Sequence, residues 1–152
     1  NGVKNSTVKN KLKIGVLGHP YILNDDHLSM GIINHLKGMN VDVITQEMIS
    51  EKKLENSAKM QPKKLFWYFN RHIMGAAYYL LNNYEAAIDG LIQVTSFGCG
   101  PDSLVKELVN LHEKTKNEIS VLNINLDEHS GEAGMITRLE AFVDLLERRK
   151  LA

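Results

Sequence analysis

The sequence predicts an α/β fold: a four-stranded parallel sheet in the order 2-1-3-4, with helices on both faces in a Rossmann-like or flavodoxin-like three-layer sandwich. Two observations support this. Short apolar runs rich in β-branched residues alternate with longer segments whose apolar residues have helical spacing. That alternation is typical of parallel βαβ units, whose crossovers are right-handed. The hydrophobic fraction of 43% and the charged fraction of 24% over 152 residues are ordinary for a globular domain.

Four short runs are predicted to be strands because each is apolar and rich in β-branched residues. The first, LKIGVL, ends at Gly18, and the second, VDVIT, starts soon after a predicted helix. The predicted strands are residues 12–17, 41–45, 89–96 and 118–126.

The segments between the strands are predicted to be helices from the spacing of their apolar residues. Pro62 suits the first turn of the longest helix and Pro101 opens the next, because proline lacks the N–H that a first turn leaves unpaired. The apolar stripe of the longest helix includes Phe66 and Phe69. The predicted inner face of the helix after Pro101 carries Leu104, Val105, Leu108 and Leu111. The predicted helices are residues 27–39, a short one near 51–58, 63–84, the one opened by Pro101, and 132–149.

The chain is predicted to contain one folded domain. Residues 1–10 are polar and aperiodic, so we expect a disordered linker or the remnant of one. Residues 11–152 are predicted to form a single α/β domain, and we expect this domain to be a fragment of a larger protein.

Charge and cysteine content limit the partners and the compartment. Eighteen basic residues balance eighteen acidic ones, so neither nucleic acid nor a membrane is expected as a partner. The one cysteine, Cys99, cannot form a disulfide within the chain, which favours a reducing compartment. No apolar run approaches the roughly 20 residues that span a bilayer. The predicted location is therefore cytoplasmic.

A ligand site is predicted at the carboxyl edge of the sheet. In the order 2-1-3-4 the switch point lies between the first and third strands, and open parallel sheets bind ligands there. The loops at 18–21 and 96–103 flank this point, and the loop at 127–130 lies beside it. Loops at this edge concentrate polar and reactive residues.

Cys99 lies in the stretch SFGCGPDS, between Gly98 and Gly100 and just before the helix that Pro101 opens. Exposed N–H groups at a helix start favour an anion, so we expect the pKa of the thiol to be lowered. The two glycines permit unusual backbone torsions and leave room beside the sulfur. The alternative is a small buried residue next to a turn, which is common for a free cysteine.

Two histidines follow strands at the same edge. His19 follows the first strand and either contacts a ligand or caps its own loop. His129 lies in the loop DEHS after the fourth strand. Asp127 and Glu128 beside it are more simply explained as acidic residues that precede a helix.

Several familiar sites are excluded. Neither a G-x-x-x-x-G-K-[ST] phosphate loop nor a G-x-G-x-x-G dinucleotide motif occurs. A zinc site built on C-x-x-C is not possible with one cysteine. A cysteine phosphatase would need an arginine shortly after the cysteine, where Leu104, Val105 and Lys106 stand.

Three stretches carry a family resemblance: GHPY at 18–21, FGCGPDS at 97–103 and DEHSGEAGMITRLEAF at 127–142. They resemble the C-terminal domain of proteins related to 2-hydroxyacyl-CoA dehydratases, such as 2-hydroxyglutaryl-CoA dehydratase, and to their activators, the CoA-substrate-specific enzyme activases. The resemblance covers most of 12–149. It implies a role in low-potential electron transfer in anaerobic metabolism, because members of this family hold an iron–sulfur cluster between two similar α/β domains.

The resemblance implies that Cys99 is a metal ligand of an iron–sulfur cluster such as 4Fe-4S. A cluster typically takes four cysteines, so the other ligands would come from another α/β domain of the parent protein or from its activator. The isolated domain is then expected to lack the cluster and to be inactive. Gly98 and Gly100 would let the backbone approach the inorganic sulfides, and His19 and His129 would line the same cleft.

The leading prediction is therefore the cysteine-donating domain of an iron–sulfur-dependent, ATP-activated 2-hydroxyacyl-CoA dehydratase-like protein or low-potential reductase. Its substrate would be a small acyl-CoA-like molecule. One alternative is a non-catalytic flavodoxin-like module that binds CoA or a nucleotide, with Cys99 structural. Another is a thiol enzyme that uses Cys99 as its nucleophile and His19 or His129 as its base.

Overall fold

The computed structural model describes residues 11–82, 86–116 and 119–152. Four parallel strands form one open sheet in the order β2-β1-β3-β4, which confirms the predicted fold class. The predicted linker at residues 1–10 lies outside the described residues. The strands are β1 Leu12–Leu17, β2 Val41–Thr45, β3 Gly90–Ser96 and β4 Ser120–Leu126.

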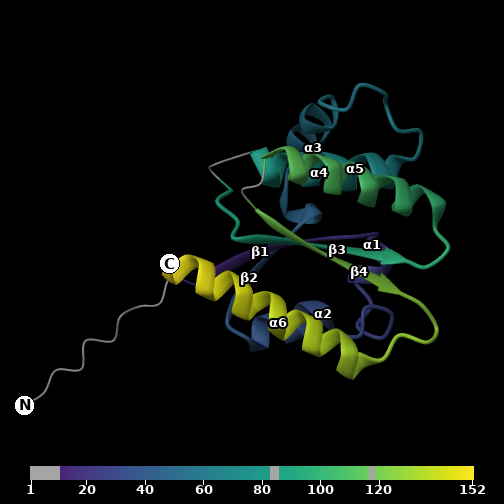
Figure 1. Cartoon of the computed structure of the whole chain (residues 1–152). Coiled ribbons are helices and arrows are strands. Elements are labelled where there is room, and N and C mark those ends of the chain that lie inside the picture. Colours follow the sequence, from purple (N-terminus) through teal and green to yellow (C-terminus); the bar gives the residue numbers. More distant parts are fainter. Residues whose placement is uncertain (1–10, 83–85, 117–118) are drawn as a thin grey trace, which may run out of the picture.

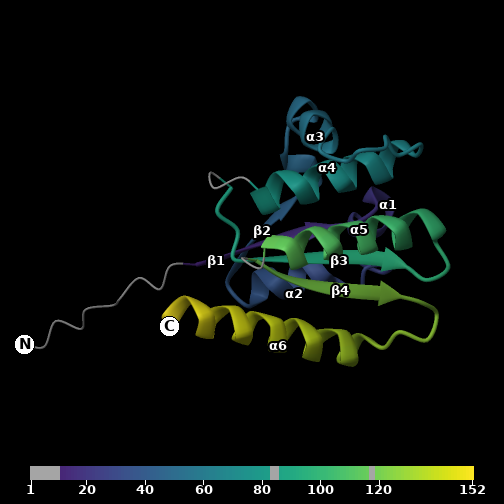
Figure 2. The same ribbon diagram turned by 45° about the horizontal axis from the view of Figure 1, so that its top comes forward.

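Helices cover both faces of the sheet, so the fold has three layers (Figure 1). They are α1 Pro20–Leu23, α2 Ile32–Gly38, the 3-10 helix η1 Gln46–Met48, α3 Glu51–Ala58, α4 Tyr68–Asn82, α5 Gly100–Lys116 and α6 Glu132–Leu151. Helices α3, α4 and α5 lie on one face, and α2 and α6 lie on the other; Figure 2 shows the same separation. Among the described residues, no helix is both long enough and apolar enough to cross a membrane.

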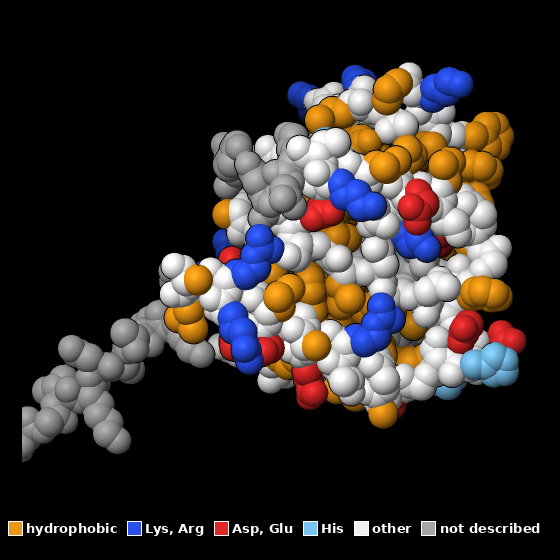
Figure 3. All heavy atoms as spheres, viewed as in Figure 1, with side chains coloured by type: hydrophobic (Ala, Val, Ile, Leu, Met, Phe, Trp, Pro, Cys, Tyr) orange, Lys and Arg blue, Asp and Glu red, His pale blue; other side chains and the backbone are white. Residues whose placement is uncertain are grey.

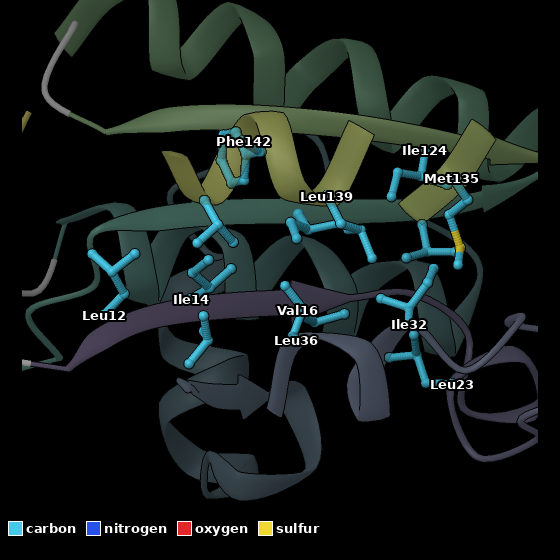
Figure 4. Packing of buried hydrophobic residues seen from close by; sticks show 14 of the residues in the cluster. Leu12, Ile14, Val16, Leu23, Ile32, Leu36, Ile124, Met135, Leu139 and Phe142 are labelled. Carbon is cyan, nitrogen blue, oxygen red and sulfur yellow. The ribbon is translucent and has the colours of Figure 1, made fainter. Parts of the chain in front are cut away.

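The apolar residues of the sheet are divided between two cores, one under each helical layer. In one core, Ile14 of β1 packs with Leu36 of α2 and Leu139 of α6 (Figure 4). The consecutive residues Leu91 and Ile92 of β3 are both fully buried but belong to opposite cores. Side chains alternate between the faces of a strand, so a strand buried on both faces needs a continuous apolar run. Each such side chain contributes about 1.5–3 kcal/mol when buried.

Helices α3 and α4 approach each other closely at Gly75. A Cβ atom added at Gly75 would overlap the backbone carbonyl of Leu54, so only glycine fits at this position. Buried side chains continue the contact, among them Ile73 and Met74 of α4. The close approach fixes α3 on α4 and therefore positions the side chains that face each other across these two helices.

The helix predicted over 27–39 begins later, at Ile32. Met30 and Gly31 have positive φ angles of 53° and 67°, a conformation that a right-handed helix does not continue through. The residues before them form turns on the carboxylate of Asp25, which accepts two backbone hydrogen bonds. The predicted loop after β1 also contains a short helix, α1, which was not expected.

The helix predicted over 63–84 begins at Tyr68, so Pro62 is not in its first turn. The end of the predicted range lies outside the described residues. Phe66 is 88% exposed and Phe69 is 50% exposed, so neither belongs to a buried stripe. Both aromatic side chains are therefore available at the surface near the start of α4.

The buried face of α5 differs from the predicted one. Val105 and Val109 are fully buried, whereas Leu104 and Leu111 are half exposed. Residues four positions apart share a helix face, which explains why the two valines are buried together. The prediction placed both leucines in the core because the apolar residues of this helix spread over a wide arc.

Candidate functional site

The strand order places the ends of β1 and β3 side by side at the carboxyl edge of the sheet. Gly18, which follows β1, is held by the buried side chain of Gln46. The Gly18 N–H donates to Gln46 Oε1 at 3.2 Å, and Gln46 Nε2 donates to the Gly18 carbonyl. This double contact comes from η1, the element after β2, and it fixes the backbone just before His19.

His19 precedes α1, and its backbone and its ring have different partners. Its carbonyl accepts two N–H groups from α1, so the backbone caps that helix. Its ring packs against Tyr21 and Phe69, with centroids 5.4 Å and 5.9 Å away. Nε2 lies 2.7 Å from Asp102 Oδ1. Because a carboxylate only accepts, Nε2 is the donor, and a neutral ring then has Nδ1 as an acceptor.

Asp102, in the first turn of α5, is only 3% exposed. Its Oδ1 atom also accepts a hydrogen bond from Asn70 Nδ2 at 2.8 Å, and Asn70 is itself buried in α4. Its Oδ2 atom is buried and has no hydrogen-bond partner among the described residues. A buried polar atom without a partner costs about 1–3 kcal/mol. This oxygen is therefore a position at which a bound group can supply the missing partner.

Cys99 lies in the turn between β3 and α5. Gly98 adopts φ 78°, a left-handed conformation that glycine takes without strain. The Cys99 N–H donates to the Ser96 carbonyl at 3.2 Å, and the Cys99 carbonyl accepts from the N–H and the hydroxyl of Ser103 at 3.1 and 3.0 Å. Gly100 begins α5, so its backbone needs no special torsion. A Cβ atom at either glycine would meet nothing within 4 Å, so the space beside this turn is open.

The tertiary structure brings Cys99 together with His19 and Asp102. One imidazole nitrogen, the sulfur and one carboxylate oxygen of these three residues all lie within 4.8 Å of one another. Thiolate, imidazole and carboxylate are the groups with which proteins bind zinc and iron. The group lies between the ends of β1 and β3, and it is a candidate metal centre.

Burial raises the pKa of the Cys99 thiol above its ordinary value, and the negative charge of Asp102 raises it further. The backbone N–H of Asp102 lowers this pKa but does not outweigh burial, the Asp102 charge and the side-chain contact with Asp102 together. The expectation of a lowered thiol pKa at this helix start is therefore wrong. Burial of the thiol is the largest effect, and the helix start offers only partial positive charge against it; the nearby Asp102 carboxylate adds to the rise.

Exposed aromatic side chains flank this edge. Tyr21 is 58% exposed, Phe69 is 50% exposed, and Phe97, in the turn after β3, is 68% exposed. Apolar side chains gather on the right side of the molecule in Figure 3, beside and above the carboxyl ends of β3 and β4. Exposed apolar groups around a polar centre are typical of a binding surface.

His129 does not join this group. Its side chain is 87% exposed, and its Nε2 lies 3.7 Å from Glu128 Oε1. Its backbone N–H and the Ser130 hydroxyl both donate to Asp127 Oδ1 at 2.9 Å, which gives Asp127 a structural role in the loop. Asp127 and Glu128 line a hollow of about 400 Å³ together with Phe97. The loop after β4 therefore faces the same edge of the sheet, with His129 on its outer side.

Three residues that organise the site were not assigned to it from the sequence: Asp102, Asn70 and Gln46. Asp102 was visible in the FGCGPDS stretch, but its burial was not. The burial of Asn70 was indicated in the sequence, because this polar residue lies three positions before the buried Ile73 on an otherwise apolar helix face. Gln46 had no comparable signal, since its role depends on the close approach of η1 to the end of β1.

Residues 2–49 match the model of a family described as a CoA enzyme activase uncharacterised domain. This match supports a relation to the CoA enzyme activase family. It includes His19 and ends before Cys99, and it does not by itself identify the C-terminal domain of a dehydratase. No curated protein matches the chain.

Proposed function

We propose that this chain is the cysteine-donating domain of an iron–sulfur-dependent, ATP-activated protein of the 2-hydroxyacyl-CoA dehydratase or low-potential reductase type. The observation that carries the proposal is the grouping of Cys99 with His19 and Asp102 at the open edge of the sheet. The family match over the first part of the chain supports the same class of protein.

The residues present can supply one of the ligands of such a cluster. A 4Fe-4S cluster typically takes four thiolates, and the chain contains one cysteine. In this proposal the other ligands come from another α/β domain of the parent protein or from its activator, and the isolated domain is inactive. The exposed Tyr21, Phe69 and Phe97 would then contact that second domain around the shared site.

The groups around Cys99 would hold and tune the cluster. Cys99 would hold the cluster as a thiolate in spite of its raised pKa, because a thiol that coordinates a metal is deprotonated. A Cβ atom at Gly98 or Gly100 would meet nothing within 4 Å, so backbone N–H groups here would be able to approach the sulfides of a bound cluster. When bound, the cluster supplies one-electron transfer at low potential.

Asp102 and the histidines would act on the surroundings of the cluster. The charge of Asp102 would lower the reduction potential of a bound cluster, because that potential depends on the net charge nearby. His19 orients that carboxylate through Nε2. His129 would reach the cofactor only where a partner domain closes over the loop between β4 and α6.

Anaerobic reconstitution of the full-length protein tests the ligand assignment. We expect Cys99→Ala to bind less iron and to show an altered visible and EPR spectrum, because one iron loses its thiolate. Thr137→Ala, which changes an exposed side chain of α6, serves as the control. Unchanged iron content and spectra in Cys99→Ala would refute the assignment.

In a second candidate Cys99 is structural, in line with the raised pKa of its thiol, and the chain is a non-catalytic module that binds CoA or a nucleotide at the same edge. A protonated thiol packs as a small apolar group. Thermal unfolding with CoA, acyl-CoA or ATP tests this candidate. A rise in Tm that persists in Cys99→Ser supports it, and the absence of any shift with these ligands rejects it. The thiol-enzyme alternative requires an activated thiol, and the raised pKa counts against it.

A further inference from the structure

A second group of metal-binding side chains lies between α3 and α4, separate from the group around Cys99. Glu51 and Glu55 are four residues apart on α3 and therefore share a helix face. His72 faces them from α4. One ligand atom of each of these three residues lies within 4.8 Å of the other two.

The ring of His72 is held in place by packing, but its Nε2 atom lacks a hydrogen-bond partner in the part of the chain that the structure describes. The side chain is 14% exposed and packs on the ring of Tyr68, with the centroids 4.1 Å apart. Its Nε2 atom is buried and has no hydrogen-bond partner among the described residues. Buried polar atoms in folded proteins nearly always have a partner, so this nitrogen requires an explanation.

The spacing of the ligand atoms suits one ion between them. His72 Nε2 lies 4.0 Å from Glu51 Oε1, which is too long for a hydrogen bond. Two zinc–ligand bonds of about 2.0–2.2 Å at a tetrahedral angle place the ligand atoms roughly 3.4 Å apart, so the exposed Glu51 side chain would move by about half an ångström to bind. Glu51 and Glu55 repel each other at this spacing on a helix, and a cation between them would remove that repulsion.

The surroundings hold the ligands in position. The Tyr68 hydroxyl donates to Glu51 Oε1 at 3.2 Å, in the way that neighbouring groups orient ligands in metal sites. The close approach of Gly75 to the Leu54 carbonyl fixes α3 against α4 nearby. The positions of these ligands therefore depend on rigid helix packing.

We propose that Glu51, Glu55 and His72 bind one divalent metal ion of the zinc class, with solvent at the remaining coordination position. An imidazole ligand favours zinc, whereas magnesium prefers oxygen ligands alone. Both glutamates are exposed, so the ion can enter from solvent. The bound ion would join α3 to α4, and its binding does not rest on the function proposed for Cys99.

Metal titration of the Cys99→Ser protein tests this site without interference from the thiol. We expect calorimetry to show binding of one equivalent of Zn²⁺, and Co²⁺ to give a visible absorption spectrum. Mg²⁺ at the same concentration should give no binding heat and should not change the Zn²⁺ or Co²⁺ results. Glu55→Gln and His72→Gln should each weaken binding by roughly tenfold or more. His129→Gln, which removes an exposed imidazole beside an exposed glutamate, should leave the affinity unchanged.

Glu55→Gln alters an exposed side chain, so its result does not depend on whether the His72 variant folds well. Unchanged affinity in Glu55→Gln and in folded His72→Gln would overturn the proposal. So would the absence of Zn²⁺ binding by the Cys99→Ser protein, or a loss of binding in His129→Gln equal to the loss in His72→Gln.

Discussion

His19 Nε2 lies 2.7 Å from Asp102 Oδ1, although 83 positions separate these residues in the chain. Asn70 donates to the same oxygen from α4. One carboxylate therefore connects the segments after β1 and β3 with a helix of the outer layer. The stability of this edge and the properties of Cys99 both depend on it.

Replacing Asp102 with alanine should lower the free energy of unfolding by about 2–3 kcal/mol, because buried Asn70 and His19 lose their acceptor. Urea unfolding followed by circular dichroism measures the change. Asp144→Ala, which removes an exposed carboxylate paired with Arg148, should change the value by less than about 0.5 kcal/mol. Equal effects of the two substitutions would contradict the structural role of Asp102.

The conservative change Asp102→Asn should lower the pKa of the Cys99 thiol, because it removes a negative charge that opposes the thiolate. A lower pKa leaves more thiolate at a given pH, so alkylation by iodoacetamide near pH 8 should be faster than in the wild type. The rate of alkylation as a function of pH gives the pKa. Asp127→Asn is the control and should leave the rate unchanged; a pKa that is the same or higher in Asp102→Asn would show that its charge does not act on the sulfur.

Gly75→Ala should destabilise the protein by more than about 2 kcal/mol, because the added Cβ overlaps the Leu54 carbonyl and forces α3 away from α4. Gly134→Ala is the matched control: it also lies in a helix, but a Cβ there meets nothing within 4 Å. That control should stabilise the protein by up to about 1 kcal/mol, from helix propensity alone. Chemical denaturation of both variants measures the difference, and a neutral Gly75→Ala would disprove the close packing.

Gly98→Ala should cost about 1–2 kcal/mol of stability, because alanine is strained at φ 78° even though space is available. Gly100→Ala, one residue beyond Cys99 and in helical conformation, should be neutral or slightly stabilising. The same unfolding assay compares the two. If both variants lose equal stability, the left-handed turn before Cys99 is not the cause.

Ser130→Ala should raise the pKa of Asp127, because the hydrogen bond from the Ser130 hydroxyl is the main cause of its lowered value. A carboxyl whose pKa is lowered on folding stabilises the native state above its unfolded pKa, and this contribution is lost as the pH falls through the folded pKa. The stability of the variant should therefore depend less on pH in the acid range. NMR titration of the Asp127 carboxyl measures the pKa, and an unchanged value would show that the hydroxyl has no effect.

The strand positions could be predicted because they depend on local patterns, and their order follows the common arrangement of open parallel sheets with right-handed crossovers. Consecutive apolar residues such as Gly15, Val16 and Leu17 in β1 are typical of strands buried on both faces. Helix starts were less predictable. Whether a helix begins at Ile32 or earlier depends on positive φ angles at Met30 and Gly31, and apolar spacing does not report them.

The candidate site was predictable only in part. His19 and Cys99 each follow a strand, and parallel strands of known order bring their carboxyl ends to one edge, so both could be placed there from the sequence. The contact between Asp102 and Asn70 could not be predicted, because it depends on how α4 and α5 are rotated against the sheet.

The amino-acid sequence by itself determined the fold class, the strand order and the edge at which the single cysteine lies, because hydrophobic periodicity and the rules of parallel connections are sufficient for these. Only the tertiary structure decided the environment of the sulfur. The helix start favours a thiolate, but burial and the buried Asp102 carboxylate outweigh it and raise the pKa of Cys99. Such a balance depends on distances between segments far apart in the chain, and local sequence patterns do not contain those distances.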